Sequence, residues 1–446
     1  MKSISAQRSI DLDTERTASA APCIAGDRPD DWNDAQAGGF DLLERAQALS
    51  SGDGGTFSLL PTKGLRTCCR CFAVGDDGEP AGVQFWHRVD DRGRSRSALS
   101  GLMRCGSMLC PVDGSARRRR ASEVLKAACL RWMQSGGRLA FVTATVRHGR
   151  EDSAEAVHLW LRAGWAELGR SRQVKNRVHG FWRAMEWNYG RNGHHGHYHA
   201  IAFLKPHIEG LGPARPAVNV QELTRNMFDM WSRGVEAAGG KRPSRACFHV
   251  SEVSNADALA TYCTKMAINA AGALAAEAAR ADEKVARGSS RSVMQVLADA
   301  TAALTKARCP DAQIDAVERR RLWRQGIADA RIFHEVVAAT RNLKWIIAPR
   351  AAELRTLFGA VQEDLDVSCS TATEGMIARG WTLVGGMGPE LFSLVRAKHG
   401  LATMVRAVAA ARDAGDASLA LLALIDAVGV NGPPYRPVPP TSSVTS

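Results

Sequence analysis

The sequence predicts an α+β fold, in which a central antiparallel sheet carries a His-x-His strand, helices flank the sheet and the C-terminal region is helical. The first observation is a pair of strand-like segments, 178–189 and 194–204, joined by Gly190-Arg191-Asn192-Gly193. A short connection rich in Gly and Asn is typical of an antiparallel hairpin. The second observation is helical periodicity on both sides of this pair, in 153–168 and 221–238.

Local signals define the other elements along the chain. The β-branched segment 138–147 is bounded by glycines and is predicted to be a strand, as is the short segment 248–253. Ser153 is a suitable N-cap for the helix of 153–168, and residues 254–257 give a capping-box signal for a further helix. The predicted organisation has six parts: 1–60 is disordered, 61–135 is a cysteine-containing and basic helical segment, 136–275 is the domain of the sheet, 276–330 is a helical linker, 331–430 is a helical C-terminal region, and 431–446 is a disordered tail.

Composition and charge narrow the class of protein. The chain has 446 residues and a formal net charge of +12, from 58 Lys and Arg against 46 Asp and Glu. This excess favours a polyanionic partner. No run of about 18 apolar residues occurs, so no membrane partner is expected. Eleven cysteines without a secretory signal suggest a reducing compartment and metal ligands rather than disulfides, so we expect a cytoplasmic protein.

Three histidines alternate along the second strand of the hairpin. In an extended strand, His195, His197 and His199 project from one face. Two such imidazoles can share a divalent ion if a neighbouring element supplies a third ligand. The hairpin would bring Glu186 alongside His197 and His199, while His195 is a rival third ligand. The alternatives are a cross-strand salt bridge for Glu186 and solvated loop positions for the histidines.

Tyr262 and Lys265 form the second candidate group. They lie three residues apart on a predicted helix and therefore share one face. A phenol beside an ammonium group is a plausible nucleophile, because the cation stabilises both the phenolate and an anionic phosphate. The alternative is an amphipathic helix with one packed tyrosine and one solvated lysine.

The order of these features resembles the three motifs of HUH endonucleases, and more closely the single-tyrosine rolling-circle replication initiators of bacterial plasmids. Those motifs are a strand such as 141–146, a His-x-His strand and a helical Tyr-x-x-Lys. The family's histidine motif reads Asn-Gly-Trp-His-Pro-His-Leu-His, and the run 192–199 here reads Asn-Gly-His-His-Gly-His-Tyr-His. The segment 101–112 is also similar to a Cys-Gly-Ser…Cys-Pro-x-Cys element of that family, and a weaker likeness continues through 333–345. The resemblance covers about residues 65–355.

Several positions depart from the family pattern. His194 replaces the tryptophan and Gly196 replaces the proline of the histidine motif, while Asp113 replaces the last cysteine of the upstream element. Some relatives carry a glutamate one helical turn before the tyrosine. Ala258 stands there in this chain, so Asp257 beside it is our candidate for a second acid.

The resemblance implies a metal-dependent nicking and joining reaction on single-stranded DNA. Mg²⁺ or Mn²⁺ held by His197, His199 and Glu186 would polarise the scissile phosphate. Tyr262 would attack phosphorus, leaving a 5′-phosphotyrosine link and a free 3′-hydroxyl, and Lys265 would offset the developing charge. The implied partners are origin DNA and, from the host, a helicase and a polymerase.

The resemblance also suggests a zinc site and a set of DNA contacts. A structural Zn²⁺ would be held by Cys68, Cys71, Cys105 and Cys110, with Cys69 as a substitute for Cys68 and Asp113 as a weaker oxygen ligand. Free thiols are the alternative. The candidate contacts to the DNA backbone are Arg117, Arg118, Arg119, Arg120 and Arg147. For the arginine run, a solvated helix face is the alternative.

Two other functions fit the same sequence features. A transposase or a mobilisation relaxase would use the same nicking reaction for transposition or for plasmid transfer instead of replication. A non-catalytic, zinc-stabilised DNA-binding regulator would use the histidines and cysteines only for structure. Replacement of Tyr262 by Phe separates these classes, because a regulator tolerates it and a nickase does not.

Overall fold

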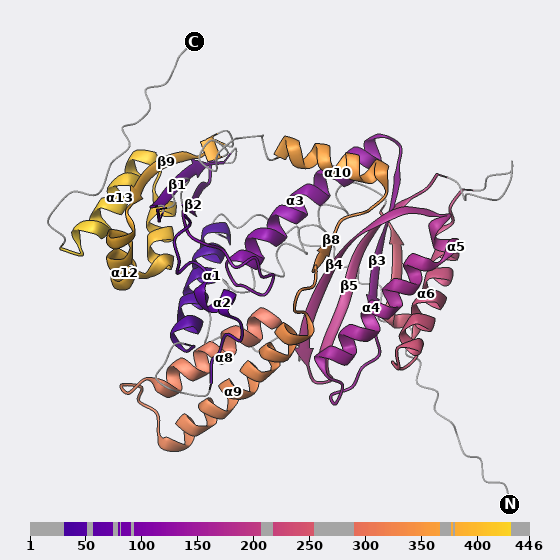
Figure 1. Ribbon diagram of the computed structural model, residues 1–446, viewed down its shortest axis with the longest axis horizontal. Coiled ribbons are helices and arrows are strands. Elements are labelled where there is room, and N and C mark those ends of the chain that lie inside the picture. Colours follow the sequence, from indigo (N-terminus) through magenta and orange to yellow (C-terminus); the bar gives the residue numbers. More distant parts are fainter. Residues whose placement is uncertain are drawn as a thin grey trace, which may run out of the picture.

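The computed structural model describes residues 31–50, 57–74, 79–80, 82–90, 93–206, 217–253, 290–365, 376–377 and 380–429. These residues form two antiparallel sheets with helices around them (Figure 1). Tyr262, Lys265 and Asp257 lie outside the described residues.

The larger sheet is built around the predicted hairpin. Strands β4 (Val178–Gly190) and β5 (Gly193–Leu204) pair in antiparallel register, and Gly193 takes a left-handed φ of 80° at the turn. The strand order is β6-β3-β5-β4-β7, with β8 also paired to β4. The other members are β3 (Arg138–Thr145), β6 (Phe248–Glu252), β7 (Arg291–Ser292) and β8 (Ile346–Ile347). The predicted antiparallel sheet is therefore confirmed.

Helices cover both faces of this sheet, because its strands alternate apolar residues toward each side. On one face, α4 (Ala154–Arg170) and α6 (Val220–Ala237) pack against residues such as Val142 and Tyr198. On the other face, α3 (Asp113–Gln134) and α10 (Ala352–Leu365) pack against Ile201 and Phe203. The short helix α5 (Arg172–Lys175) leads into β4, and η1 (Arg245–Cys247) leads into β6. The odd-numbered histidines of β5 belong to the α3 and α10 face.

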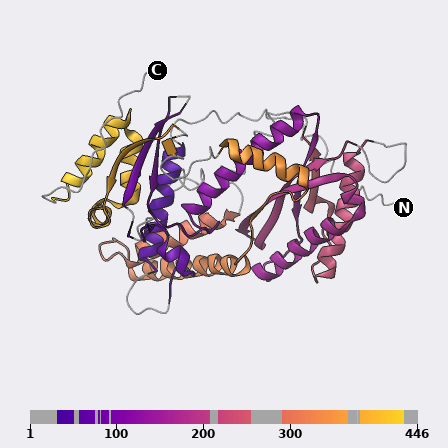
Figure 2. The same cartoon turned by 45° about the horizontal axis from the view of Figure 1, so that its top comes forward.

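The smaller sheet joins segments from opposite ends of the chain. Strands β1 (Val83–Val89), β2 (Ser95–Ser100) and β9 (Thr382–Met387) lie in the order β2-β1-β9. Helices α1 (Asp31–Ala48), α12 (Pro389–Ala410) and α13 (Ala414–Asp426) surround it, seen at the left of Figures 1 and 2. The carboxylate of Glu44 in α1 binds Arg396 at 2.9 Å and accepts a hydrogen bond from the Leu401 amide at 3.0 Å. We call this assembly the terminal unit.

A helical hairpin links the two sheets. Helices α8 (Val293–Arg308) and α9 (Ala316–Ala339) pack side by side, below the smaller sheet and to the left of the lower end of the larger sheet in Figure 1. At its base, Arg291 donates hydrogen bonds to Asp299 at 2.7 Å and to both carboxylate oxygens of the buried Asp329, at 2.6 and 3.0 Å. The short helix α2 (Lys63–Thr67) lies between α1 and the loop before α3.

Two parts of the predicted organisation are wrong. Residues 31–48 form α1 rather than a disordered segment, because their apolar side chains are buried against α12 from the far end of the chain. Residues 290–330 are not a linker, since α8 and α9 form a packed hairpin, and the boundary at 330 falls inside α9. The described part of 331–430 is mainly helical, as predicted, and also contributes β8 and β9, the second of which completes the smaller sheet.

Candidate metal centre

The hairpin of β4 and β5 brings Glu186, His197 and His199 together. Glu186 lies directly opposite His197 in the strand register. Its Oε2 atom is 3.2 Å from Nε2 of His197 and 3.1 Å from Nε2 of His199. These three potential ligand atoms all lie within 4.8 Å of one another, which is close enough to share one ion.

The neighbouring strand β3 orients His199. Thr143 is paired with His199 across the sheet, and its Oγ1 atom lies 3.3 Å from Nδ1 of that histidine. The ring of Phe141 stacks on the imidazole, with 5.7 Å between the centroids and 18° between the planes. With a cation between Nε2 of His199 and Glu186, a Thr143 hydroxyl that accepts from Nδ1–H would leave the Nε2 lone pair for that cation, which is how outer partners orient metal-binding histidines.

The charges in this group favour a bound cation. Burial raises the pKa of Glu186, but hydrogen bonds from His197 and His199 outweigh it and hold that pKa well below its usual range. The carboxylate is therefore ionised, and two imidazole nitrogens point at one of its oxygens. The Nδ1 atom of His197 is buried and has no hydrogen-bond partner among the described residues. One carboxylate and two imidazoles form a mixed donor set that suits a divalent transition metal or Mg²⁺.

His195 lies on the same face but outside the group of three. Its ring centroid is 5.3 Å from that of His197, and its Nδ1 atom is 2.8 Å from Nε2 of His148. Burial lowers the pKa of His195 to about 4, with further lowering by the charges of His197 and His148. His195 is therefore a neutral imidazole beside the group. The sequence analysis did not single out His148, which follows β3 and carries no motif of its own.

Two departures from the family motif have structural partners on the opposite face. Trp187 donates to Nδ1 of His194 at 3.3 Å, so the Nε2–H of His194 donates to Glu335 of α9 at 2.8 Å. A Cβ atom at Gly196 would lie 2.7 Å from Leu161 and 2.8 Å from Trp187. A residue larger than glycine at position 196 would therefore have to displace the Trp187 indole and the Leu161 side chain.

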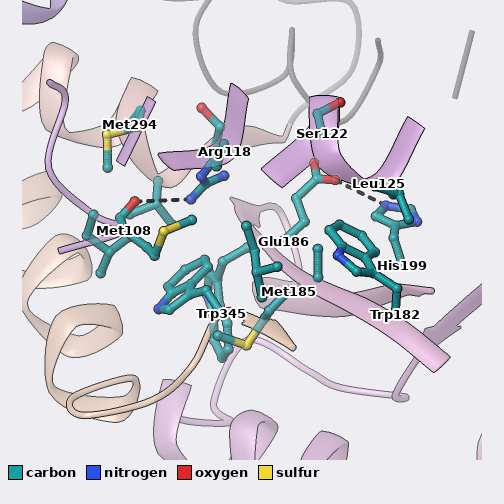
Figure 3. Close-up of a pocket in the computed structure, with 16 residues that line it drawn as sticks. Met108, Arg118, Ser122, Leu125, Trp182, Met185, Glu186, His199, Met294 and Trp345 are labelled. Carbon is teal, nitrogen blue, oxygen red and sulfur yellow. Dashed lines mark hydrogen bonds and ion pairs between the residues drawn. The ribbon is translucent and has the colours of Figure 1, made fainter. Parts of the chain in front are cut away.

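A small cavity of about 50 Å³ adjoins Glu186 and His199 (Figure 3). Arg118 of α3 lines it, donates to the carbonyl of Met108 at 3.2 Å and stacks over the ring of Trp345 at 5.4 Å. Burial lowers the pKa of Arg118 to about 10, and the charge of Glu186 opposes this effect. The guanidinium therefore remains charged at neutral pH and places a positive charge beside Glu186 and His199.

The other candidate arginines are placed differently. Arg117 lines a separate, larger cavity, and Arg120 lies 3.8 Å from Glu123. Arg147 is exposed, and its backbone pairs with Lys241. The side chain of Arg119 lies outside the described part of the chain.

Three of the predicted cysteines form a cluster. The sulfurs of Cys68, Cys105 and Cys110 lie within 4.8 Å of one another, with 3.6 Å between Cys68 and Cys110. Hydrogen bonds from the thiols of Cys105, Cys110 and Cys69 hold the pKa of Cys68 well below its usual range. Cys71 is exposed and lies outside the cluster, so its place in the predicted ligand set is wrong.

Asp113 is not part of the cysteine cluster either. Its carboxylate accepts a hydrogen bond from the Gly106 amide, which draws it toward the loop before α3. Cys69 lies 3.8 Å from Cys68 and accepts a hydrogen bond from Arg104 at 3.4 Å. The sequence could not distinguish these arrangements, because Cys68, Cys69 and Cys71 are too close in the chain for spacing to decide which sulfur turns inward.

The two described tyrosines lie away from the candidate metal centre. Tyr198 projects toward α4, where Trp165 contacts its ring and the Arg183 guanidinium lies 4.1 Å from the ring centre. Burial raises the pKa of Tyr198. Tyr189 packs against His194 on the same side of the sheet.

Comparison with known proteins gives one curated relative. The chain is 29% identical over 247 residues to a Streptomyces lividans protein named "Protein rep", an alignment that covers 45% of this chain and 54% of that protein. The chain thus spans about half the length of this relative. No protein-family model matches the chain, and no solved structure matches it. Among the described helices, none combines the length and the apolar character needed to cross a membrane.

Proposed function

We propose that this protein is a rolling-circle replication initiator of the HUH type, which nicks and rejoins single-stranded DNA at a plasmid or phage-like origin. The observation that carries the proposal is the convergence of Glu186, His197 and His199 on one point of the hairpin. Similarity to a protein named "Protein rep" supports a role in replication. Such an enzyme acts in the cytoplasm, where a host polymerase extends the free 3′-hydroxyl and a host helicase opens the duplex.

Glu186, His197 and His199 are the residues that would hold Mg²⁺ or Mn²⁺. Bound there, the ion supplies Lewis-acid polarisation of a phosphate oxygen. Thr143 and Phe141 fix the ring of His199, so this ligand is oriented before the ion arrives. Arg118 adds a charged donor at the edge of the same cavity, where it can bind a non-bridging phosphate oxygen.

Tyr262 is the proposed nucleophile. Tyr198 and Tyr189 project from the opposite face of the sheet, so their hydroxyl groups face away from Glu186, His197 and His199. Tyr262 follows Val253, the residue after β6, by nine residues, and β6 belongs to the same sheet as the histidine strand β5.

The proposed reaction transfers the scissile phosphoryl group from a 3′ oxygen of DNA to the Tyr262 oxygen. The Tyr262 oxygen forms a bond to phosphorus as its proton leaves, the bond from phosphorus to the 3′ oxygen breaks, and that oxygen takes up a proton. Lys265, one helical turn from Tyr262, would offset negative charge on the phosphoryl group. The reverse attack by a 3′-hydroxyl rejoins the strand, and no nucleotide cofactor is consumed because the phosphodiester energy is kept in the tyrosine link.

The cysteine cluster is proposed to hold a structural Zn²⁺. Sulfurs bound at about 2.3 Å around a tetrahedral ion lie about 3.8 Å apart, and the Cys68–Cys110 separation of 3.6 Å is close to this value. The low pKa of Cys68 favours the thiolate form that binds metals. Cys68, Cys105 and Cys110 would supply three ligands, and zinc would need a fourth.

The test is formation of a covalent link between the protein and DNA. Purified protein is incubated with end-labelled single-stranded DNA from its own replicon and Mn²⁺, and the products are separated on a denaturing gel. We expect a protein-linked band that disappears with Tyr262→Phe and with chelator and persists in the matched control Tyr189→Phe. Binding without any link would contradict the proposal and favour the DNA-binding regulator.

A further inference from the structure

A larger cavity, of about 720 Å³, opens beside the candidate metal centre. It is lined by three segments that are distant in the sequence, 62–64 at the start of α2, 105–109 before α3 and 340–346 after α9, together with Arg117 and Ala121 of α3 and Val337 of α9. Four cationic side chains line it, and no acidic residue does; the four are Lys63, Arg117, Arg341 and Lys344. All four are exposed.

The four cations are not neutralised within the described part of the chain. None of them forms an ion pair with another described residue, although many other arginines here do, including Arg177 with Glu222 and Arg170 with Glu167. Like charges gathered around one hollow repel each other unless an anion or water separates them. This arrangement is therefore suited to a polyanionic ligand.

The larger cavity adjoins the small cavity beside Glu186 and His199. The two cavities share the lining residues Met108, Leu109, Trp345 and Ile346. Arg117 lines the larger cavity, and the next residue, Arg118, lines the smaller one with Glu186. In Figure 3, Arg118 and Trp345 lie on the side of Met108, whereas His199 lies on the other side of Glu186. Positive charge thus runs from the exposed rim to the histidine pair.

We infer that the cavity lined by 62–64, 105–109 and 340–346 binds the sugar-phosphate backbone of single-stranded DNA and leads it to the metal centre. This inference rests on the proposed function, which requires a phosphodiester at Glu186. A volume of 720 Å³ is more than one phosphate group needs, and repeated cations match repeated phosphates. Contacts to phosphate fix the position of the strand without reading its sequence.

The test compares the salt dependence of DNA binding in two charge-matched pairs of variants. Fluorescence anisotropy of a labelled oligo-dT strand is measured with the full chain between about 50 and 200 mM NaCl. The first variant is Lys63→Ala with Lys344→Ala. The control is Arg172→Ala with Lys175→Ala, two exposed residues of α5 at the end of β4 and β5 far from the histidines.

Loss of two phosphate contacts on a single strand lowers the slope of log K against log salt by about 1.4. We expect this decrease in the cavity variant and no decrease in the α5 variant. Equal slopes in the two variants, or an unchanged slope in the cavity variant, would overturn the inference. So would equal competition by a blunt duplex of the same length, because the proposed ligand is a single strand.

The assay separates this inference from the proposed function. All anisotropy measurements use Tyr262→Phe protein in chelator, so no nicking contributes to the binding signal. A normal covalent link in the wild-type protein together with an unchanged slope would reject the cavity and keep the nickase. A smaller slope in the cavity variant without any covalent link in the wild-type protein would reject the nickase and keep the cavity as a DNA site.

Discussion

The Nε2 atom of His148 lies 2.8 Å from the Nδ1 atom of His195. The other nitrogen of His148 lies 3.0 Å from the carbonyl oxygen of Asn192, which can only accept. His148 therefore carries its proton on Nδ1, and its Nε2 accepts from His195. This leaves the Nε2 lone pair of His195 free on the face that carries His197.

The hydrogen bond between His148 and His195 predicts that His148 influences metal affinity without being a ligand itself. If His195 completes the metal site, His148→Leu weakens Mn²⁺ binding by about 10-fold or more, the usual effect of removing an outer partner of a ligand. Isothermal titration of the purified protein measures it, with His179→Leu, a histidine paired with Glu353 away from the site, as the control. Unchanged affinity in His148→Leu would show that His195 is not a ligand.

Glu186 is predicted to be essential for binding the ion. Glu186→Gln keeps the shape of the side chain and removes the charge, so Mn²⁺ affinity should fall by at least about 100-fold, beyond the range of outer-partner changes. Glu353→Gln is the matched control, because Glu353 also lies beside a histidine, at 3.2 Å from His179, but is exposed. Similar losses in both variants would mean that the effect is general rather than local.

The cysteine cluster is predicted to retain zinc after purification. Elemental analysis should find about one Zn²⁺ per chain, and Cys68→Ser should abolish it and lower the thermal midpoint, because zinc binding stabilises only the folded state. Cys247→Ser, outside the cluster, should leave both values unchanged. Wild-type protein without zinc would identify the three sulfurs as free thiols.

Asp329 is predicted to stabilise the α8–α9 hairpin. It is buried and accepts two hydrogen bonds from Arg291, so Asp329→Ala leaves that guanidinium with Asp299 alone and should cost about 3 kcal/mol of unfolding free energy. Chemical denaturation measures the change. Glu318→Ala removes an exposed partner of Arg321 in the same helix and should be silent. A comparable loss in both variants would contradict this account.

His87 is predicted to make the terminal unit sensitive to acid. Burial lowers its pKa from 6.5, opposed in part by a hydrogen bond to the Ala411 carbonyl and by the charge of Asp413. The unfolded state then binds the proton more tightly, so stability is full above pH 6.5 and decreases as the pH falls through the lower, folded-state pKa. His87→Gln should flatten this part of the stability curve. Parallel curves for the two proteins would assign the dependence to other groups.

Local sequence signals were sufficient for the hairpin and for the proximity of Glu186 to His197 and His199. The Gly/Asn turn fixed the register of β4 and β5, and register alone placed Glu186 opposite His197. The sequence did not point to His148, because its role depends on a tertiary contact. The segment after β3 lies against the turn at Asn192, and hydrophobic periodicity does not predict such a contact.

Long-range pairing was beyond the sequence reasoning. Val83 of β1 pairs with Met387 of β9, and α1 packs mainly against α12. Neither segment has a strong pattern of its own, because each supplies one side of a core whose other side lies hundreds of residues away. The same reason explains the wrong assignment of 31–48 to disorder.

The β1–β9 pairing sets an order for synthesis of the chain on the ribosome. When β1 and β2 have emerged, about 300 residues must still be translated before β9 can cover the outer edge of β1. At typical rates this interval is about 15 to 60 seconds. During that time α1 and the unpaired edge of β1 are exposed to chaperones and to other nascent chains. The histidine hairpin, in contrast, pairs with β3, which has already been translated. A messenger cut short before β9 would therefore yield a chain that still contains Glu186, His197 and His199 on their hairpin but leaves the edge of β1 uncovered and prone to aggregation.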